Sequence, residues 1–476
     1  MSPLPAPPAD AGPPDRLRAP LLAHLRALTN GLLERDTAAH LMLLAALAGE
    51  HVLLIGPPGT AKSELARRLH RCLAGARYFE RLLTRFSTPE ELFGPLSLKA
   101  LEDDRYERLT DGYLPTASVA FLDEVFKANS AILNALLTLL NEREFDNGAQ
   151  RLPTPLISVV AASNEPPGDD ALQAFHDRFL LRVPVAPVSD AAFATLLRLP
   201  GQAQDGTPEP ITQDERQLVA RQAAHVTLGD EALAALQALR SQAQQRAEVV
   251  SDRRWRQLVA LMRCQAASEG RPAIDKLDLW LAPYVVGTDA PSVAAWAQWV
   301  THSLVQAVTE PFEWLGHAVQ AFEKQLELEE RLPAEGANGA DDDAGKLALA
   351  RSLGAQDESG MPRLLAATLE LRQRRHFSPV HIQARLTQVR SVQQRAHEAQ
   401  QQVQAQHDTL AAALRGRIWL PQALADSWLQ AHRQSLATLA TLAARLAQTA
   451  QGFAALPVDD SATATLPPPV NLDTPG

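Results

Sequence analysis

Short apolar runs alternate with helical patterns between residues 21 and 200 of the chain. Between these runs, apolar positions recur at the three- and four-residue spacing of amphipathic helices, for example over Leu21–Ala48. Buried strands that alternate with helices are typical of a parallel sheet covered on both faces, and ligands bind beyond the carboxyl ends of its strands. The predicted strands are Val52–Ile55, Tyr78–Leu83, Val119–Leu122, Leu156–Ala162 and Leu180–Val185.

Turn signals predict smaller features within this α/β region. Arg105–Leu114 alternates in polarity and contains Asp-Gly, and Asp146-Asn147-Gly148 follows the helical pattern of Ala131–Glu142. Asp-Gly and Asn-Gly favour tight hairpin turns, so we expect a hairpin at each place. The capping box Ser87-Thr88-Pro89-Glu90 predicts a helix start.

Beyond residue 200 the strand patterns stop and helical patterns take over. A long amphipathic stretch runs from Val293 to Leu332, and two long helical patterns flank a break at Arg415–Pro421. That pair predicts an antiparallel helical hairpin. We therefore divide the chain into a disordered Pro-rich leader (1–20), an α/β core (21–200), an all-α lid (211–290), a long helical segment (291–332), a linker (333–377), a helical hairpin completing a three-helix stalk (378–455) and a disordered tail (456–476).

Composition narrows the class of protein. Hydrophobic residues make up 46% and charged residues 21%, as in ordinary globular proteins, and the net charge of −10 gives no basic footprint for nucleic acid. Cys72 and Cys264 lack metal-ligand spacing and are expected to be free thiols in a reducing cytosol. No run approaches the ~20 apolar residues of a membrane helix, and the N-terminal region lacks a signal peptide's apolar segment. These features predict a cytoplasmic protein with no membrane-spanning segment.

A phosphate-binding loop is the first candidate site. The residues Gly56-Pro57-Pro58-Gly59-Thr60-Ala61-Lys62-Ser63 connect the first predicted strand to a helical pattern. Unpaired N–H groups at such a helix start attract phosphate, Lys62 would contact the β- and γ-phosphates, and the Ser63 hydroxyl would bind Mg²⁺. Ala61 stands where the pattern has glycine, which alanine can replace if the backbone there is right-handed helical.

Polar residues at two other strand ends have chemical and structural interpretations. Asp123 would hold Mg²⁺ through water, and Glu124 would polarise the water that attacks the γ-phosphate. An acidic pair there also suits a helix N-cap. Asn164 would orient the attacking water or contact the γ-phosphate, although asparagine also suits an ordinary turn before Pro166-Pro167.

Three arginines complete the candidate set. Arg178, in His176-Asp177-Arg178-Phe179, would reach the γ-phosphate of a neighbouring subunit, or it would serve as a cation at a helix C-terminus. Arg253 and Arg254, in Ser251-Asp252-Arg253-Arg254-Trp255, begin a lid helix, and one of them would contact phosphate. Solvated charge at a surface helix start is the alternative.

These motifs, in this order, resemble those of the MoxR family of AAA+ ATPases, and most of all its RavA subgroup. The resemblance covers residues 21–285 and includes Thr84–Ser97, Phe121–Glu124, Ser163–Glu165 and Val250–Trp255. It implies that Lys62 and Ser63 belong to Walker A, Asp123 and Glu124 to Walker B, Asn164 is sensor 1 and Arg178 is an arginine finger. Arg253 is the best match to sensor 2, with Arg254 a close rival.

The resemblance also implies a function. Such proteins form homo-oligomeric rings, usually hexamers, that bind ATP and Mg²⁺ between subunits, work with a von Willebrand factor A-domain partner, and remodel or mature protein complexes in a chaperone-like way. A nucleotide-switched assembly module with slow hydrolysis is the alternative, and a nucleic-acid motor is disfavoured by the net charge. The two predicted hairpins match insertions that project toward substrate or partner. RavA-type proteins carry a compact β-rich domain in the interval that here spans 333–377, and we expect that domain to be missing or vestigial.

Overall fold

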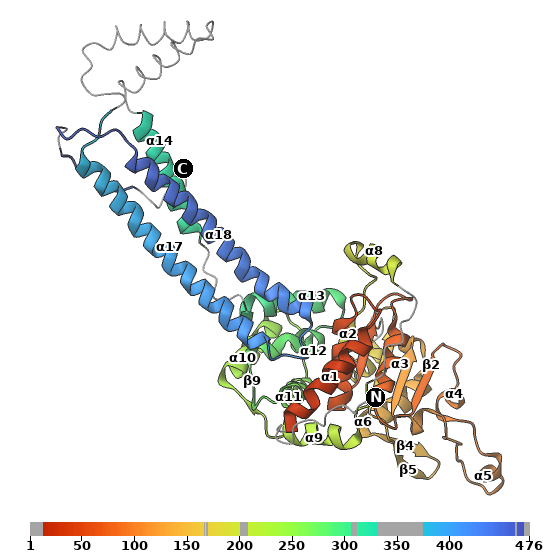
Figure 1. Cartoon of the computed structure of the whole chain (residues 1–476). Coiled ribbons are helices and arrows are strands. Elements are labelled where there is room, and N and C mark those ends of the chain that lie inside the picture. The colour runs from red at the N-terminus through yellow and green to blue at the C-terminus, as the bar shows by residue number, and fades with distance from the viewer. Residues whose placement is uncertain are drawn as a thin grey trace. The chain divides into compact units, whose positions relative to one another are not determined.

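The computed structural model describes residues 13–165, 167, 170–199, 208–305, 312–331, 375–461 and 464–470 (Figure 1). The chain forms two compact units. One comprises residues 1–307 together with Leu414–Trp428, and the other comprises residues 308–413 together with Leu429–Gly476. Among the described helices, none is long and apolar enough to cross a membrane.

The first unit is built on a five-stranded parallel sheet with the order β2-β3-β6-β1-β7. All five strands fall where the apolar runs predict them. Ile55 pairs with Ser163, and Leu82 pairs with Asp123, so the carboxyl ends of the strands share one edge. The strands are β1 (Val52–Ile55), β2 (Tyr78–Leu82), β3 (Val119–Asp123), β6 (Ser158–Ser163) and β7 (Leu181–Pro184).

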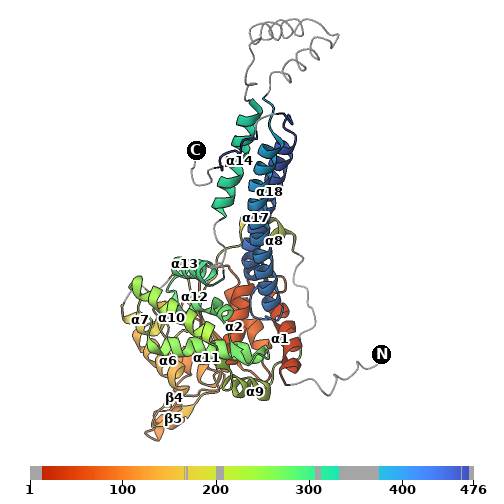
Figure 2. The same cartoon turned by 90° about the vertical axis from the view of Figure 1, so that its left-hand side faces the viewer.

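Alternate strand residues build the core under one face of the sheet. Leu53, Leu122 and Ala161 pack in one buried cluster with Leu136 and Leu139 of α6. The period of two along strands and of three to four along helices places these residues on facing surfaces. The other helices of the core are α1 (Pro13–Thr29), α2 (Asp36–Ala48), α3 (Lys62–Arg71), α7 (Asp170–His176) and α8 (Asp190–Arg198), and α6 spans Ser130–Glu142 (Figure 2).

One of the two expected hairpins is present. Strands β4 (Glu144–Asn147) and β5 (Gln150–Pro153) form the hairpin predicted at Asn147-Gly148. The prediction of a hairpin within Arg105–Leu114 is wrong, because this segment pairs with the preceding residues 95–97. The N–H of Ser97 donates to the carbonyl of Glu107 (2.8 Å), and that of Leu109 donates to Pro95 (2.8 Å). Two short helices, α4 (Pro89–Phe93) and α5 (Leu98–Glu102), complete this region.

The lid is helical, with two departures from expectation. A two-residue parallel pair joins β8 (Thr227–Leu228) to β9 (Ala273–Ile274), although no strand was expected beyond residue 200. The stretch from Val293 to Leu332 is not one helix, because α13 passes at Thr301 into a π-helical turn and α14 begins at Glu313. The lid helices are α9 (Gln213–Ala223), α10 (Asp230–Gln245), α11 (Asp252–Ser268), α12 (Ala282–Val286) and α13 (Ala290–Val300).

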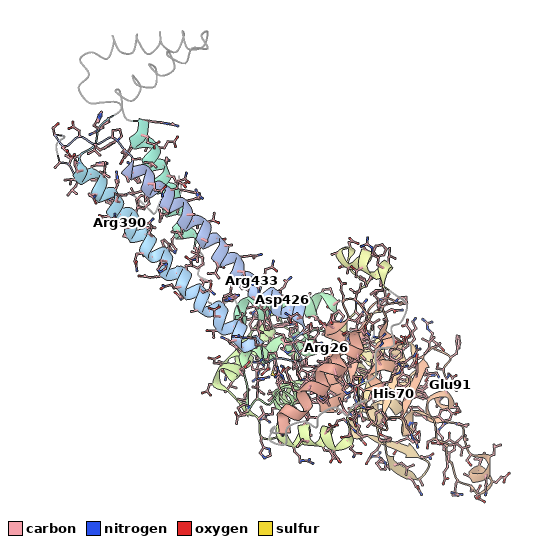
Figure 3. The ribbon with its side chains drawn as sticks, in the orientation of Figure 1. Arg26, His70, Glu91, Arg390, Asp426 and Arg433 are labelled. Carbon is pink, nitrogen blue, oxygen red and sulfur yellow. The ribbon has the colours of Figure 1, made fainter. Side chains whose placement is uncertain are left out.

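The second unit contains α14 (Glu313–Arg331) and most of α17 (Pro379–Leu414) and α18 (Gln422–Ala454). Val319, Val392 and Leu446, one from each helix, belong to a shared buried cluster. Arg390 on α17 and Arg433 on α18 lie on exposed faces (Figure 3). Helices α17 and α18 thus lie on either side of the break that the 3/4 spacing predicts at Arg415–Pro421.

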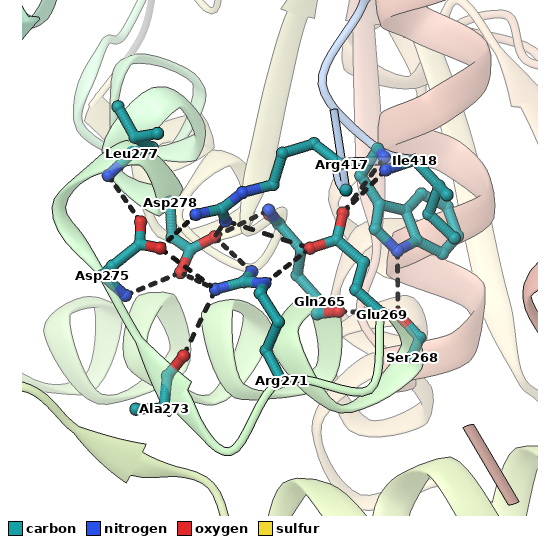
Figure 4. Close-up of polar contacts among 12 residues, drawn as sticks. Gln265, Ser268, Glu269, Arg271, Ala273, Asp275, Leu277, Asp278, Arg417 and Ile418 are labelled. Carbon is teal, nitrogen blue, oxygen red and sulfur yellow. Dashed lines mark hydrogen bonds and ion pairs between the residues drawn. The ribbon is translucent and has the colours of Figure 1, made fainter. Parts of the chain in front are cut away.

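The turn between α17 and α18 belongs to the first unit. Arg417 forms ion pairs with Asp275 and Asp278 of the lid, and Ile418 and Trp419 are buried beside them (Figure 4). A carboxylate oxygen of Glu269 accepts a hydrogen bond from the N–H of Ile418 (2.9 Å). Lid side chains thus satisfy the polar groups of this turn.

Two predicted disordered segments are partly ordered. Helix α1 begins at Pro13, and residues Leu17 and Leu21 are buried, so the predicted leader is too long at its C-terminal end. In the tail, Val458 bridges to Phe377, and the carbonyl of Pro468 accepts a hydrogen bond from Arg385 (2.7 Å). Buried leucines explain the first error, and backbone hydrogen bonds to the stalk helices and their flanks explain the second. Most of the predicted linker 333–377 lies outside the described residues. The prediction that this interval lacks a compact domain concerns the same residues.

Candidate nucleotide-binding site

The phosphate-binding loop follows β1 and ends at the first turn of α3. A Cβ at Gly56 would lie 2.0 Å from the carbonyl oxygen of Val185, so only glycine fits between β1 and the end of β7. Pro57, Pro58 and Gly59 form an exposed rim, Thr60 is buried, and Ser63 is half-buried in the first turn of α3. The loop therefore presents its backbone at the N-terminus of a helix, where phosphate is stabilised.

Lys62 is folded against this loop. Its Nζ donates hydrogen bonds to the carbonyl oxygens of Gly56 (2.7 Å) and Pro57 (2.9 Å). Burial lowers the pKa of Lys62, while the charges of Asp123 and Glu124 oppose that shift. The ammonium is thus a partly desolvated cation, held by two backbone carbonyls and close enough to Asp123 and Glu124 to feel their charge.

The backbone at Ala61 does not meet the condition under which alanine would replace glycine without cost. Its φ is 66° and its ψ is 23°, which is left-handed rather than right-handed helical. The carbonyl of Ala61 already accepts the N–H of Leu65 (3.0 Å), so the residue is the N-cap of α3. Glycine adopts this conformation readily, whereas alanine pays a steric cost of about 1 kcal/mol.

The acidic pair and Asn164 meet at the ends of neighbouring strands. The side-chain amide of Asn164, after β6, donates a hydrogen bond to Oε1 of Glu124, after β3. Nζ of Lys127 lies 3.3 Å from the same oxygen. Glu124 has a left-handed backbone (φ 54°), a strained conformation that is common at functional sites. The Glu124 side chain makes no helix-capping hydrogen bond, which disfavours the capping alternative for this residue.

The candidate arginines differ in their surroundings. Arg178 is half-buried, and its Nε has no hydrogen-bond partner among the described residues. Arg253 is exposed, with both terminal nitrogens 3.4 Å from Oδ1 of Asn141. Arg254 is 3% exposed and donates to the turn that carries Arg178. Within the described chain, neither Arg178 nor Arg253 hydrogen-bonds to the phosphate-binding loop.

Sequence analysis missed a buried arginine behind the loop. Nε of Arg35 donates to the carbonyl of Thr60 (3.0 Å), and Nη2 donates to that of Ala186 (2.8 Å). Beside it lies a cavity of about 350 Å³. No motif in the sequence marks Arg35, which lies between the apolar positions Leu33 and Leu41. The cavity is lined by, among others, Arg35, Thr37, Ala38, Val185, Tyr284 and Val293.

These features define the class of protein. The loop after β1, the amide after β6 and the carboxylates after β3 lie at the ends of three adjacent parallel strands. Glycine-rich turns that open a helix, followed by an acidic strand end, are the parts of a P-loop nucleotide-binding protein. A helical lid follows this α/β core in the chain.

Comparison with known families gives the more specific assignment. Residues 19–227 match a family model described as the MoxR domain in the MoxR-vWA-beta-propeller ternary systems, and residues 231–300 match a model of an AAA lid domain. The chain belongs to the MoxR family of AAA+ ATPases. The first match ends after α9, and the second begins at the start of α10.

Individual relatives show how far the similarity extends. Uncharacterized protein MJ0079 of Methanocaldococcus jannaschii is 40% identical over 268 residues, which cover 56% of this chain and 70% of that protein. MJ0812 of the same organism is 41% identical over 257 residues, covering 53% and 67%. The protein named Chaperone MoxR1 of Mycobacterium tuberculosis is 28% identical over 192 residues, covering 38% and 49%.

Proposed function

We propose that this chain is a Mg²⁺-dependent ATPase whose hydrolysis remodels or matures a partner protein complex. The observation that carries the proposal is the convergence of Lys62, Asp123 and the Asn164–Glu124 pair at the ends of adjacent strands. A cation, a metal-binding carboxylate and a water-polarising carboxylate are the groups that phosphoryl transfer to water requires. Family membership supports the same chemistry.

Each residue has a definite role in this proposal. Lys62 and the N–H groups of Gly59–Ser63 bind the phosphates, and Glu124 accepts the proton of the attacking water. The Ser63 hydroxyl and the Asp123 carboxylate suit Mg²⁺, which takes few protein ligands and completes its shell with phosphate oxygens and water. When bound, Mg²⁺ neutralises charge on the β- and γ-phosphates. Asn164 holds the carboxylate of Glu124 in place.

The cavity beside Arg35 is the proposed site of the adenine base. Its volume of about 350 Å³ and its mixed lining of Thr37, Val185 and Tyr284 fit a flat aromatic ring with polar edges. Arg35 lines the cavity and also hydrogen-bonds to the carbonyl of Thr60 in the phosphate-binding loop. Base and phosphates would then occupy neighbouring parts of one site.

The proposed assembly is a homo-oligomeric ring, a hexamer, with Arg178 acting on the nucleotide of the adjacent subunit. Its half-buried guanidinium, with an Nε that has no partner in the described structure, supports this role. For the sensor 2 contact we favour Arg253, since Arg253 is exposed whereas the guanidinium of Arg254 is occupied by backbone carbonyls.

The proposed partner and location rest on separate observations. The matched family model is described from systems that contain a vWA protein, so we propose a von Willebrand factor A-domain partner. We propose that the chain belongs to the RavA subgroup, on the basis of the long helices α17 and α18. Two buried free thiols, Cys72 and Cys264, suit a cytoplasmic location.

Substitution of Glu124 tests the central claim. Glu124→Gln should keep ATP binding and abolish turnover, because the amide cannot accept the proton from water. Lys62→Ala should lose binding itself. Glu231→Gln, an exposed position on α10, is the matched control and should behave as wild type. ATP turnover near the wild-type rate in Glu124→Gln would refute the proposal.

A nucleotide-switched assembly module with slow hydrolysis is the second candidate. The observation that favours it is the ion pair of Glu124 with Lys127, whose ammonium lies 3.3 Å from the same carboxylate oxygen that Asn164 contacts and competes with water for it. Partner capture by Glu124→Gln should be measured with and without ATP. If wild type releases the partner without turnover, the switch is favoured over the remodelling enzyme.

A further inference from the structure

A lid arginine is buried against the turn that carries Arg178. Arg254, in the first turn of α11, donates from Nη1 to the carbonyls of Asp177 (3.2 Å) and Phe179 (3.1 Å). Its Nη2 donates to the carbonyl of Leu180 (2.9 Å), and its Nε donates to that of Val285 (3.1 Å). One guanidinium thus binds the backbone on both sides of Arg178.

A carboxylate and a second arginine complete this cluster. Oδ1 of Asp177 accepts from Nη1 of Arg254 (3.2 Å) and from Nη2 of Arg182 (3.4 Å). Nη1 of Arg182 also donates to the carbonyl of Gly287 (3.3 Å). Both arginines are buried, and burial lowers the pKa of Arg254 and lowers that of Arg182 to about 9. Two buried cations with one carboxylate are stable only where carbonyl oxygens supply the remaining acceptors.

This geometry leaves Arg178 little freedom at its backbone. The N–H of Arg178 donates to the carbonyl of Phe175 (3.0 Å), and the carbonyls of the residues before and after it are held by Arg254. The direction in which the Arg178 side chain leaves the turn is therefore set by a residue of the lid. Small misplacements matter here, since a shift of ~1 Å in a catalytic group can cost ~100-fold in rate.

We infer that Arg254 is a positioning residue through which lid helix α11 holds Arg178 for its action on a neighbouring subunit. This inference rests on the proposed function, in which Arg178 acts in trans. The neighbouring Arg253 is exposed on the same helical turn. If Arg253 contacts nucleotide, the first turn of α11 has two roles. Arg253 contacts the nucleotide of its own subunit, and Arg254 positions Arg178, which acts on the nucleotide of the next subunit.

Mixing of variants tests the inference. Arg254→Met should bind a fluorescent ATP analogue within about twofold of wild type and lose roughly 10- to 100-fold in turnover. Mixed with Lys62→Ala, whose finger is intact, it should regain turnover, because its own nucleotide site is sound. Mixed with Arg178→Ala it should regain none, because neither subunit supplies a competent finger. A residue that acts on its own subunit's nucleotide would give the opposite pattern.

Controls separate the possible failures. Arg256→Met, an exposed arginine on α11, should keep wild-type turnover. If Arg254→Met does not fold, Asp177→Asn, whose side chain is 41% exposed, should give the same mixing pattern with a smaller loss of turnover. Recovered turnover with Arg178→Ala would overturn the positioning role. A mixture of Arg178→Ala and Lys62→Ala that stays inactive would instead overturn the trans action assumed in the proposed function.

Discussion

Asn164 and Glu124 lie forty residues apart in the chain and are joined by a hydrogen bond from the amide of the first to the carboxylate of the second. The bond exists because β6, which precedes Asn164, is the sheet neighbour of β3, which precedes Glu124. The sheet order therefore brings the side-chain N–H₂ group of Asn164, a donor, next to the carboxylate of Glu124, an acceptor. A water bound by Glu124 would be oriented by the same contact.

Replacing this amide by a carboxylate should impair turnover. Asn164→Asp places two carboxyl groups side by side, and like charges at that distance disfavour the ionisation of both. We expect turnover at pH 7 to fall by ~100-fold and the acidic limb of the pH–rate profile to move to higher pH. Steady-state kinetics between pH 5 and 9 would measure this. Asn134→Asp, an exposed position on α6, is the control, and an unmoved profile in Asn164→Asp would contradict the role.

The strain at Ala61 leads to a stability prediction. Ala61→Gly removes the steric cost of the left-handed conformation, partly offset by the greater freedom of glycine in the unfolded chain. We expect the free energy of unfolding to rise by about 0.5–1 kcal/mol, measured by urea denaturation. Ala234→Gly, at an exposed position within α10, should instead lower it by about 1 kcal/mol. Equal effects at the two positions would show that the backbone at Ala61 is not left-handed in solution.

The sheet could be predicted from sequence because its signals are local. The apolar run Val52–Ile55 has the same bounds as β1, and all four of its residues are buried. Strand order is not a local property, yet the motifs at strand ends constrain it, since Lys62, Asp123 and Asn164 must share one edge. The Arg105–Leu114 hairpin failed because its hydrogen-bond partners, Pro95 and Ser97, lie outside the segment.

Contacts between distant segments explain what sequence analysis missed. Arg35 belongs to the site only because its guanidinium reaches the carbonyl of Thr60, and no motif marks it. Arg254 was a close rival of Arg253 in sequence, but Arg254 is buried and Arg253 is exposed, because successive helix positions face different sides. The left-handed backbone at Ala61 depends on the loop's path and not on residue type.

Acid should destabilise the core through His51. Its Nδ1 accepts the N–H of Val159 (3.0 Å), and its Nε2 lies 3.2 Å from the carbonyl of Leu140, so the neutral ring fits and a second proton would break a hydrogen bond. Burial, with the charges of Arg143 and Arg253, lowers the pKa of His51 to about 3. The unfolded chain binds this proton below about pH 6.5 and the folded chain does not, so stability falls as pH decreases.

The size of this effect can be measured by comparing variants. When the pH is lowered from 7 to 5, His51 should lower the free energy of unfolding by about 2 kcal/mol. His51→Gln, which can donate and accept but does not titrate, should show a pH dependence that is shallower by that amount. His225→Gln, at an exposed position, should keep the full slope. Urea denaturation at each pH supplies the values, and parallel slopes for wild type and His51→Gln would disprove the assignment.

The α17–α18 turn should depend on Arg417 for its attachment to the lid. The Arg417 side chain is 4% exposed and pairs with Asp278, whose side chain is fully buried (Figure 4). Burial raises the pKa of Glu269, and the charges of Arg271 and Arg417 oppose that shift. Arg417→Met would leave these carboxylates with one buried cation fewer, and removing one partner from a buried ionic network costs about 3–5 kcal/mol.

The loss of stability in Arg417→Met should be local to the first unit. The amides of Ile418 (2.9 Å) and Trp419 (3.4 Å) both donate to Oε1 of Glu269, so their hydrogen exchange should quicken in Arg417→Met because this acceptor is disturbed. Arg415→Met removes an exposed arginine from the same turn and should leave exchange and unfolding unchanged. Similar unfolding free energies for the two variants would mean that Trp419, which also donates to Ser268 (2.8 Å), holds the turn without help from the ionic network.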